Sequence, residues 1–190
     1  MTIGPAGLRI ETARLAVRLA EADDVDELID YDRRNAEHLA PWEPRRRADR
    51  LDRDVRRERL LRARAEADAD TGYHFVALAH GDRRVVASIS LNHVLRFALQ
   101  ACQLGYSVDR EHEGVGIAFE AVSAVVGFAF GTLRLHRVMA SYQPANERSG
   151  RLLRRLGFVP EGYARDYLFI DGAWRDHIMT ARINPDAVEP

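Results

Sequence analysis

The segment Gln100–Ala118, QACQLGYSVDREHEGVGIA, contains the change of pattern that decides the fold. Its first half alternates apolar and polar residues, which is typical of a β-strand with one buried face. Its second half places Gly114 and Gly116 just before a long stretch with helical apolar spacing. The first N–H groups of such a helix have no partner within the helix and carry the positive end of its dipole. The segment therefore predicts a strand, a turn that can hold an anion, and a helix.

The two glycines alone do not identify a phosphate site, because such a pair is often only a tight turn. A Walker loop is excluded, since its spacing and its lysine are absent. A dinucleotide-binding repeat is also excluded, because the preceding strands form a meander and do not open a βαβ unit. Glycine would still let the backbone approach an anion without a Cβ in the way.

The residues on either side of this segment predict an α/β (α+β) fold. We expect a mixed, mostly antiparallel sheet of about six to seven strands with helices on both faces. The expected elements are a strand within 8–20, helices at about 24–40 and 48–69, strands at 74–80, 85–94 and 100–108, a helix from about 116, a strand at 136–143, a helix at 146–156, and strands at 158–170 and 173–182.

Length and composition predict one globular domain over residues 1–190. The chain has a net charge of −1 and 46% hydrophobic residues, with no apolar run long enough for a membrane span and no signal-peptide pattern. We therefore expect a cytoplasmic protein without a membrane partner. The single cysteine, Cys102, excludes an internal disulfide and is interpreted as a small buried hydrophobic residue.

The basic residues are concentrated in one segment. All 28 are arginines, and residues 45–64 contain ten of them against four acidic residues. One interpretation is a solvated helix face with ion pairs between successive turns. The alternative is a docking surface for an acidic or RNA-containing partner such as the ribosome.

A second motif lies in PANERSGRLLRRLGF, residues 144–158. Asn146 stands at the expected N-cap of a helix, where its side chain can accept from a free N–H or contact a ligand. Ser149, three residues later, lies on the same helix face. By themselves these residues could be an ordinary cap and a surface serine.

Together, the strand, the EGVGIA turn, the helix, the next strand and the N-x-x-S helix resemble the GNAT acetyltransferase superfamily. The Q/R-x-x-G-x-G/A motif of that family falls on Glu113, Gly116 and Ala118. Further stretches resemble the RimJ/RimL branch, whose members acetylate ribosomal proteins. These stretches are HLAPWEP (38–44), QACQLGYS (100–107), HRVMASYQPANERSGRLLRRLGF (136–158) and EGYARDYLFIDGAWRDH (161–177).

The resemblance implies a GNAT fold that binds acetyl-CoA as a co-substrate and needs no metal. It implies that the strands at about 100–108 and 136–143 splay apart, so that the pantetheine arm pairs with the first of them. Ser149 is implied as the catalytic hydroxyl that bonds to the departing thiolate. The implied cofactor-binding residues are Tyr106, Ser107, Val108, Glu113, Gly114, Val115, Gly116, Ile117, Ala118 and Asn146.

Two positions depart from the family pattern. Many relatives have a tyrosine as the acid for the thiolate seven residues after the asparagine, but this chain has Leu153, which leaves Ser149 as the candidate. Glu113 stands where glutamine or arginine is usual, and a carboxylate facing the pyrophosphate would repel it. We therefore expect the Glu113 side chain to face solvent or to pair with Arg110 or Arg151.

The resemblance implies that the acceptor is a protein N-terminus, with alanine on a small-subunit ribosomal protein as the expected substrate. Deprotonating an α-amine with a pKa of roughly 7.7–8.0 costs about 1.2 kcal/mol at pH 7, against about 4.6 kcal/mol for lysine. The expected substrate is thus the easier amine for a site without an evident base. Asp166, Glu43 and His93 are the candidate bases.

The acceptor slot is expected to involve the HLAPWEP stretch (38–44) and the final hairpin. We expect it to include Trp42, Asn92, Tyr167 and Trp174, although either tryptophan could instead belong to the core. Two other functions stay open. One is acetylation of a small amine such as a polyamine, an antibiotic or an aminoacyl-nucleotide; the other is a weakly catalytic acetyl-CoA-binding or ribosome-associated module. The oligomeric state is also open.

Overall fold

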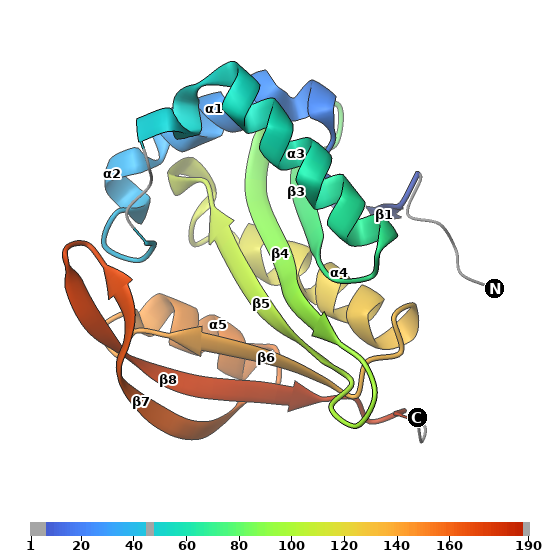
Figure 1. Cartoon of the computed structure of the whole chain (residues 1–190), viewed down its shortest axis with the longest axis vertical. Helices are drawn as coiled ribbons and strands as arrows, with labels where there is room; N and C mark the ends of the chain where they lie inside the picture. The colour runs from blue at the N-terminus through green and yellow to red at the C-terminus, as the bar shows by residue number, and fades with distance from the viewer. Residues whose placement is uncertain (1–6, 45–47, 188–190) are drawn as a thin grey trace.

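The computed structural model describes residues 7–44 and 48–187. The order of helices and strands along the chain is much as the residue pattern predicts (Figure 1). The elements are β1 (Arg9–Glu11), β2 (Leu15–Leu19), the 3₁₀ helix η1 (Ala22–Asp24), α1 (Val25–Arg34), α2 (Ala36–Leu39), the 3₁₀ helix η2 (Ala48–Leu51), α3 (Arg53–Asp68), β3 (Tyr73–Ala79), β4 (Val85–Leu95), β5 (Ala101–Val108), the 3₁₀ helix η3 (Arg110–His112), α4 (Ile117–Gly131), β6 (Arg137–Tyr142), α5 (Glu147–Arg155), β7 (Val159–Ile170) and β8 (Ala173–Ile183).

The strands form one mixed sheet in the order β1-β2-β3-β4-β5-β6-β8-β7. Neighbouring strands are antiparallel except for β5 and β6, which are parallel. The mixed, mostly antiparallel sheet is therefore confirmed, with eight strands where about six to seven were expected. The extra strand arises because 8–20 is a hairpin. Its turn is closed by Thr12, whose N–H and hydroxyl both donate to the Leu15 carbonyl at 2.9 and 3.0 Å.

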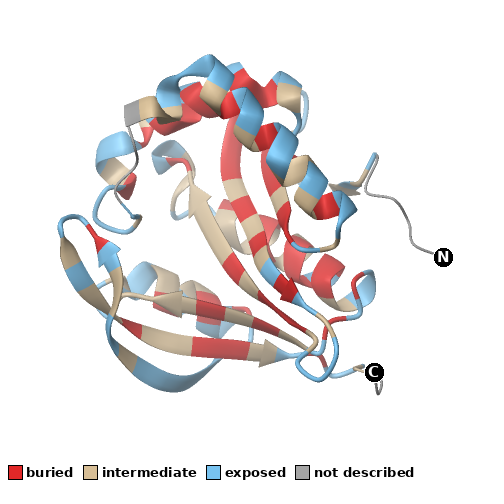
Figure 2. Cartoon of the chain, in the orientation of Figure 1, coloured by how far each residue is buried: buried red, intermediate tan, exposed pale blue. Residues whose placement is uncertain are grey.

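Helices cover both faces of the sheet, as predicted. Helices α1 and α3 pack on one face and α4 and α5 on the other (Figure 1). The larger core lies between the sheet and α4, whose buried side chains recur every three to four residues, and the central strands are buried on both sides (Figure 2). The buried residues of α4 are Ile117, Ala121, Val122, Val125, Val126, Phe128 and Ala129.

The helix expected at 24–40 is divided at Asn35, which is fully buried. Its amide Nδ2 donates to the Tyr31 carbonyl at 2.9 Å, and its Oδ1 accepts from the Arg110 N–H at 2.9 Å. Asparagine competes with helical hydrogen bonds in this way, so a break is physically reasonable. The contact to Arg110 fixes η3, which leads directly into the two-glycine turn.

The arginine-rich segment forms η2 and α3, while Arg45, Arg46 and Arg47 lie outside the described residues. Many of its other arginines form ion pairs. Two pairs join successive turns of α3, as one interpretation predicted, but others join η2 and α3 to Asp26 and Asp32 of α1. The paired arginines are Arg50, Arg53, Arg56, Arg59, Arg62 and Arg64.

Candidate active site

The sheet opens between β5 and β6, as expected. The two strands pair only over Ala101–Gln103 and Arg137–Met139. Beyond these residues β5 stays paired with β4 as far as Val108, and β6 stays paired with β8 as far as Tyr142. The two strands consequently diverge toward their C-terminal ends (Figure 1).

One edge of β5 faces this opening. The Asp109 N–H donates to the Val86 carbonyl at the start of β4 at 2.9 Å, whereas the Gln100 carbonyl accepts from the His136 N–H on the β6 side at 2.7 Å. Because backbone groups alternate in direction along a strand, even-numbered residues of β5 turn theirs toward the opening. Past the paired region these residues are Tyr106 and Val108.

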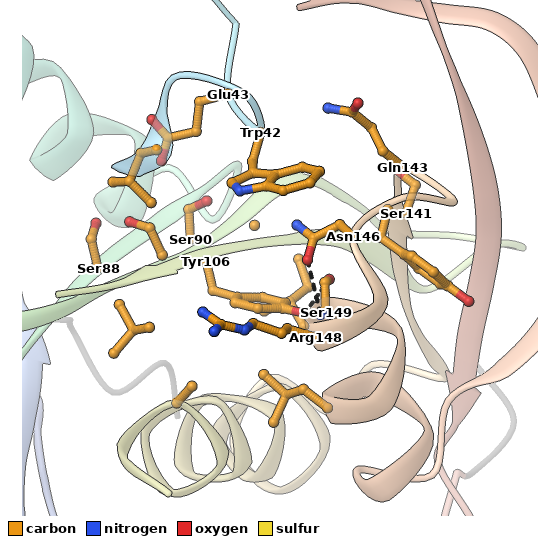
Figure 3. Close-up of a pocket in the computed structure, with 18 of the residues that line it drawn as sticks. Trp42, Glu43, Ser88, Ser90, Tyr106, Ser141, Gln143, Asn146, Arg148 and Ser149 are labelled. Atoms are coloured by element: carbon orange, nitrogen blue, oxygen red, sulfur yellow. Dashed lines mark hydrogen bonds between the residues drawn. The ribbon is translucent and has the colours of Figure 1, made fainter. Parts of the chain in front are cut away.

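A cleft of about 1590 Å³ occupies the opening. It exceeds the usual range for small-ligand pockets, roughly 300–1,000 Å³, and so has room for a long ligand or for two ligands together. Side chains reach it from β4, β5, β6, the loop after α2 and the first turns of α5. Trp42, Tyr106, Asn146 and Ser149 point into the same space (Figure 3).

The turn before α4 is built by two glycines with left-handed backbone. Gly114 has a φ of 73° and Gly116, the N-cap of α4, a φ of 85°. The first N–H bonded back into this turn is that of Glu120, which donates to the Gly116 carbonyl at 3.1 Å. Arg14 holds the turn from outside the cleft, with its Nη1 donating to the Val115 carbonyl at 2.8 Å. The N–H groups from Gly114 to Phe119 are thus available to an anion.

Asn146 and Ser149 stand on α5 across the cleft from this turn. Asn146 caps the helix, since its Oδ1 accepts from the Ser149 N–H at 3.1 Å. The Ser149 hydroxyl lies 2.7 Å from the hydroxyl of Tyr106, a contact that the sequence did not suggest (Figure 3). Burial raises the pKa of Tyr106 to about 12, so its hydroxyl remains protonated at physiological pH.

A close approach of α5 to β6 positions this serine. Gly150 follows it directly, and a Cβ at Gly150 would lie 2.7 Å from the ring of Tyr142. Only glycine lets the tyrosine ring pack so closely on the helix. The Leu153 side chain, at the position where relatives have tyrosine, is buried in the core and is not among the cleft residues.

The Glu113 side chain is paired, but the predicted partners were wrong. Its carboxylate accepts from Arg148 Nη1 and lies 3.2 Å from His38 Nε2. Arg151 instead pairs with Glu147, one turn earlier in α5, at 3.0 Å. Tertiary packing places the first turn of α5 and the short helix α2 beside the turn, which spacing along the chain does not reveal.

Most predicted cofactor-binding residues line the cleft. Val115 is largely exposed and Ile117 is buried, and neither side chain belongs to the lining. Their backbone N–H groups still belong to the turn. The predicted residues whose positions line the cleft are Tyr106, Ser107, Val108, Glu113, Gly114, Gly116, Ala118, Asn146 and Ser149.

The expected acceptor slot is only partly assembled. Trp42 and Asn92 line the cleft, and the Gln143 amide donates to the Pro41 carbonyl at 2.9 Å, which ties the Trp42 loop to the end of β6. Tyr167 and Trp174 are not among the lining residues. Tyr167 packs edge-on against His177 and Trp174 against Phe169.

The position of the final hairpin explains this difference. Its pairing register shifts between Ala164 and Leu168, so Leu168, Ile170 and His177 reach the cleft instead. Of the candidate bases, Glu43 and His93 line the cleft, whereas Asp166 lies at the irregular part of β7 and its N–H donates to Asp176 at 2.8 Å. The sequence gives no signal for such a register shift.

No group of three or more potential metal-ligating side chains occurs within residues 7–44 and 48–187. Over the same ranges, no helix is long and apolar enough to cross a membrane.

Comparison with known proteins identifies the class. Residues 14–159 match the acetyltransferase (GNAT) domain, and the chain therefore belongs to the GNAT acetyltransferase family. It is 39% identical over 179 residues to the ribosomal protein uS5-alanine N-acetyltransferase of Escherichia coli. The matched residues cover 94% of this chain and 92% of the relative.

Two solved structures extend the similarity to the fold. The ribosomal-protein-S5-alanine acetyltransferase of Vibrio fischeri has a TM-score of 0.92 and 37% identity, covering 96% of this chain and all of that one. Mycobacterium smegmatis RimJ in complex with CoA-disulfide has a TM-score of 0.85 and 29% identity, covering 92% of this chain and 84% of that one. The GNAT fold is therefore confirmed.

Proposed function

We propose that this protein transfers the acetyl group of acetyl-CoA to the α-amine of a protein N-terminus, an alanine on a small-subunit ribosomal protein. The observation that carries the proposal is the meeting of three features in one cleft: the two-glycine turn, the open edge of β5 and the Asn146–Ser149 cap. Sequence similarity over nearly the whole chain to an alanine N-acetyltransferase supports the choice of acceptor.

The donor half of the cleft fits acetyl-CoA. The N–H groups from Gly114 to Ala118 suit a pyrophosphate, because no Cβ of Gly114 or Gly116 stands between backbone and anion. The free N–H and carbonyl groups of Tyr106 and Val108 suit the amides of an extended pantetheine arm, which would add to the strand. Asn146 would contact that arm.

The reaction needs only positioning and hydrogen bonds from the protein. The amine nitrogen bonds to the acetyl carbon, the carbon–sulfur bond breaks with its electron pair going to sulfur, and the amine gives up a proton. A free N–H of β5 can stabilise charge on the acetyl oxygen. Ser149 can donate a hydrogen bond to the sulfur as it becomes a thiolate.

The cleft does not suit a polyamine. The acidic residues that line it within the described ranges are Glu43, Glu113 and Glu147, and each has an arginine within 4.0 Å. Such pairing leaves little net negative charge to attract a polycation. The cleft is also too open for a closed pocket that encloses a small antibiotic. A peptide end entering over Ser90 and Asn92 fits better.

The acceptor can be tested with peptides that differ only at the amine. Both peptides begin with alanine and contain a lysine, but one has a blocked N-terminus. The unblocked peptide should release free CoA thiol from acetyl-CoA, whereas the blocked peptide should not. The rate at subsaturating peptide should rise about tenfold per pH unit and level off near pH 8, because the α-amine has a pKa of roughly 7.7–8.0. Turnover confined to polyamines, or a rate still rising toward pH 10, would contradict the N-terminal acceptor. Tight CoA binding without turnover of any amine would favour the weakly catalytic module.

Glu113→Gln should leave CoA binding unchanged or tighten it. The substitution removes a negative charge beside the proposed pyrophosphate site and releases Arg148, which can then approach the phosphates. Binding would be measured by calorimetry at low and at physiological salt, with Glu147→Gln as the control that frees Arg151 from its own carboxylate. Weaker CoA binding by Glu113→Gln would show that the carboxylate supports the site.

A ribosomal substrate would place the reaction in the cytoplasm. Ribosome or RNA contact through residues 45–64 stays a prediction. Such a contact would have to compete with the ion pairs of α3. Because it would be electrostatic, it should also weaken steeply with salt. Binding of the protein to ribosomes at increasing salt would measure it.

A further inference from the structure

The hydroxyl pair of Tyr106 and Ser149 is not explained by packing alone. The two oxygens are 2.7 Å apart, and they come from β5 and α5 on opposite sides of the opening in the sheet. Both residues line the cleft. Each hydroxyl has one hydrogen to donate, so the direction of this bond decides which hydroxyl can serve a ligand.

The chemistry of the departing sulfur favours one direction. If Ser149 donates to Tyr106, its only hydroxyl hydrogen is used within the protein. If Tyr106 donates to Ser149, the serine hydrogen is free for the sulfur. A hydrogen bond to an anionic acceptor is roughly twice as strong as one between neutral groups, so a developing thiolate selects the second arrangement.

We propose, on the basis of the function proposed above, that Tyr106 is a positioning residue that directs the Ser149 hydrogen to the sulfur of the bound thioester. The chain of donors runs from the Tyr106 hydroxyl to Ser149 and from Ser149 to sulfur. The Ser149 N–H is held by Asn146 at 3.1 Å, so the backbone that carries this hydroxyl is also fixed.

Tyr106 does not supply the proton itself. Burial raises its pKa to about 12. A thiol with a pKa of about 8.5 is the stronger acid by roughly 3.5 units, which opposes proton transfer from the phenol about three-thousandfold. The amine releases the proton in this reaction, and the two hydroxyls only stabilise charge on sulfur.

The first test does not depend on turnover. The ultraviolet absorbance of the thiolate reports the pKa of the CoA thiol when CoA is bound to the protein. The only cysteine, Cys102, does not interfere, because burial raises its pKa to about 12. Tyr106→Phe keeps the ring and removes the hydroxyl, and it should raise the pKa of bound CoA by about one unit. Ser149→Ala should raise it similarly, and the double variant should add little.

The second test separates kcat from KM. Tyr106→Phe should lower kcat about tenfold, leave KM for acetyl-CoA nearly unchanged, and have little effect in a Ser149→Ala background. Tyr73→Phe is the matched control. It removes a buried hydroxyl that donates to the Asp70 carboxylate at 2.8 Å, and Tyr73 does not line the cleft. Its kcat and bound-thiol pKa should equal those of the wild type.

Two results would overturn the inference: a Tyr106→Phe protein with wild-type kcat and bound-thiol pKa, or full additivity of the two substitutions. Thermal melting of each variant separates loss of folding from loss of the hydrogen bond. Only folded protein binds CoA, so the pKa of the bound thiol reports on the folded fraction alone. If no amine is acetylated by the wild type, the proposed function fails, while the thiol titration still decides the role of Tyr106.

Discussion

Ser149→Ala should lower kcat for acetyl transfer by about ten- to a hundredfold, which corresponds to the roughly 1.5–3 kcal/mol of a hydrogen bond to a charged group. The affinity for CoA should change little, because the thiol of the ground state is neutral and gains little from the hydroxyl. The missing bond matters only when the carbon–sulfur bond breaks. Steady-state kinetics with calorimetric titration of CoA measures both quantities.

Ser123→Ala is the matched control, because Ser123 lies on α4 and is not among the residues that line the cleft. It should retain the wild-type kcat. The N-cap on Asn146 involves the backbone N–H of residue 149 and survives the alanine substitution. An unchanged kcat in Ser149→Ala would remove this serine from the chemistry and leave the β5 N–H groups as the main source of stabilisation.

Gly116→Val should weaken CoA binding by about a hundredfold or more. A β-branched residue at a φ of 85° costs roughly 1–3 kcal/mol, so the turn would rearrange or the helix would begin elsewhere. A Cβ would also lie 3.3 Å from Nη2 of Arg14, which anchors the Val115 carbonyl. Both effects turn N–H groups away from the proposed pyrophosphate position, and calorimetry with CoA measures the loss.

Gly127→Ala provides the comparison within the same helix. Gly127 is exposed, and a Cβ built there meets nothing within 4 Å. Alanine should therefore stabilise α4 by up to about 1 kcal/mol and leave CoA binding unchanged. Equal CoA affinities for Gly116→Val and the wild type would mean that the turn does not hold the phosphates.

Much of the fold could be predicted because its signals are local. Apolar alternation along residues 100–108 and the helical spacing after Gly116 each require only neighbouring residues. The hairpin at 8–20 was missed because its turn depends on Thr12, an ordinary residue in an otherwise strand-like stretch. The break at Asn35 was missed for a related reason, since its hydrogen bond to Arg110 spans 75 residues.

The candidate site divides in the same way. Sequence placed the glycine turn and the Asn146–Ser149 cap, because backbone conformation and helix capping are set by residues a few positions apart. It also flagged Glu113 as an exception. Three features required three-dimensional distances: the partners of Glu113, the exposed position of Trp174 against Phe169, and the contact of the Tyr106 hydroxyl with Ser149.

The sequence by itself determined the order of the elements, the two-glycine turn before α4 and the GNAT resemblance. Only the tertiary structure decided what meets in the cleft, because β5 and α5 are about forty residues apart and approach each other across the opening in the sheet. A hydrogen bond between Tyr106 and Ser149 depends on the distance between two strands and the tilt of one helix. Those quantities follow from packing of the whole core and are not encoded in any short motif.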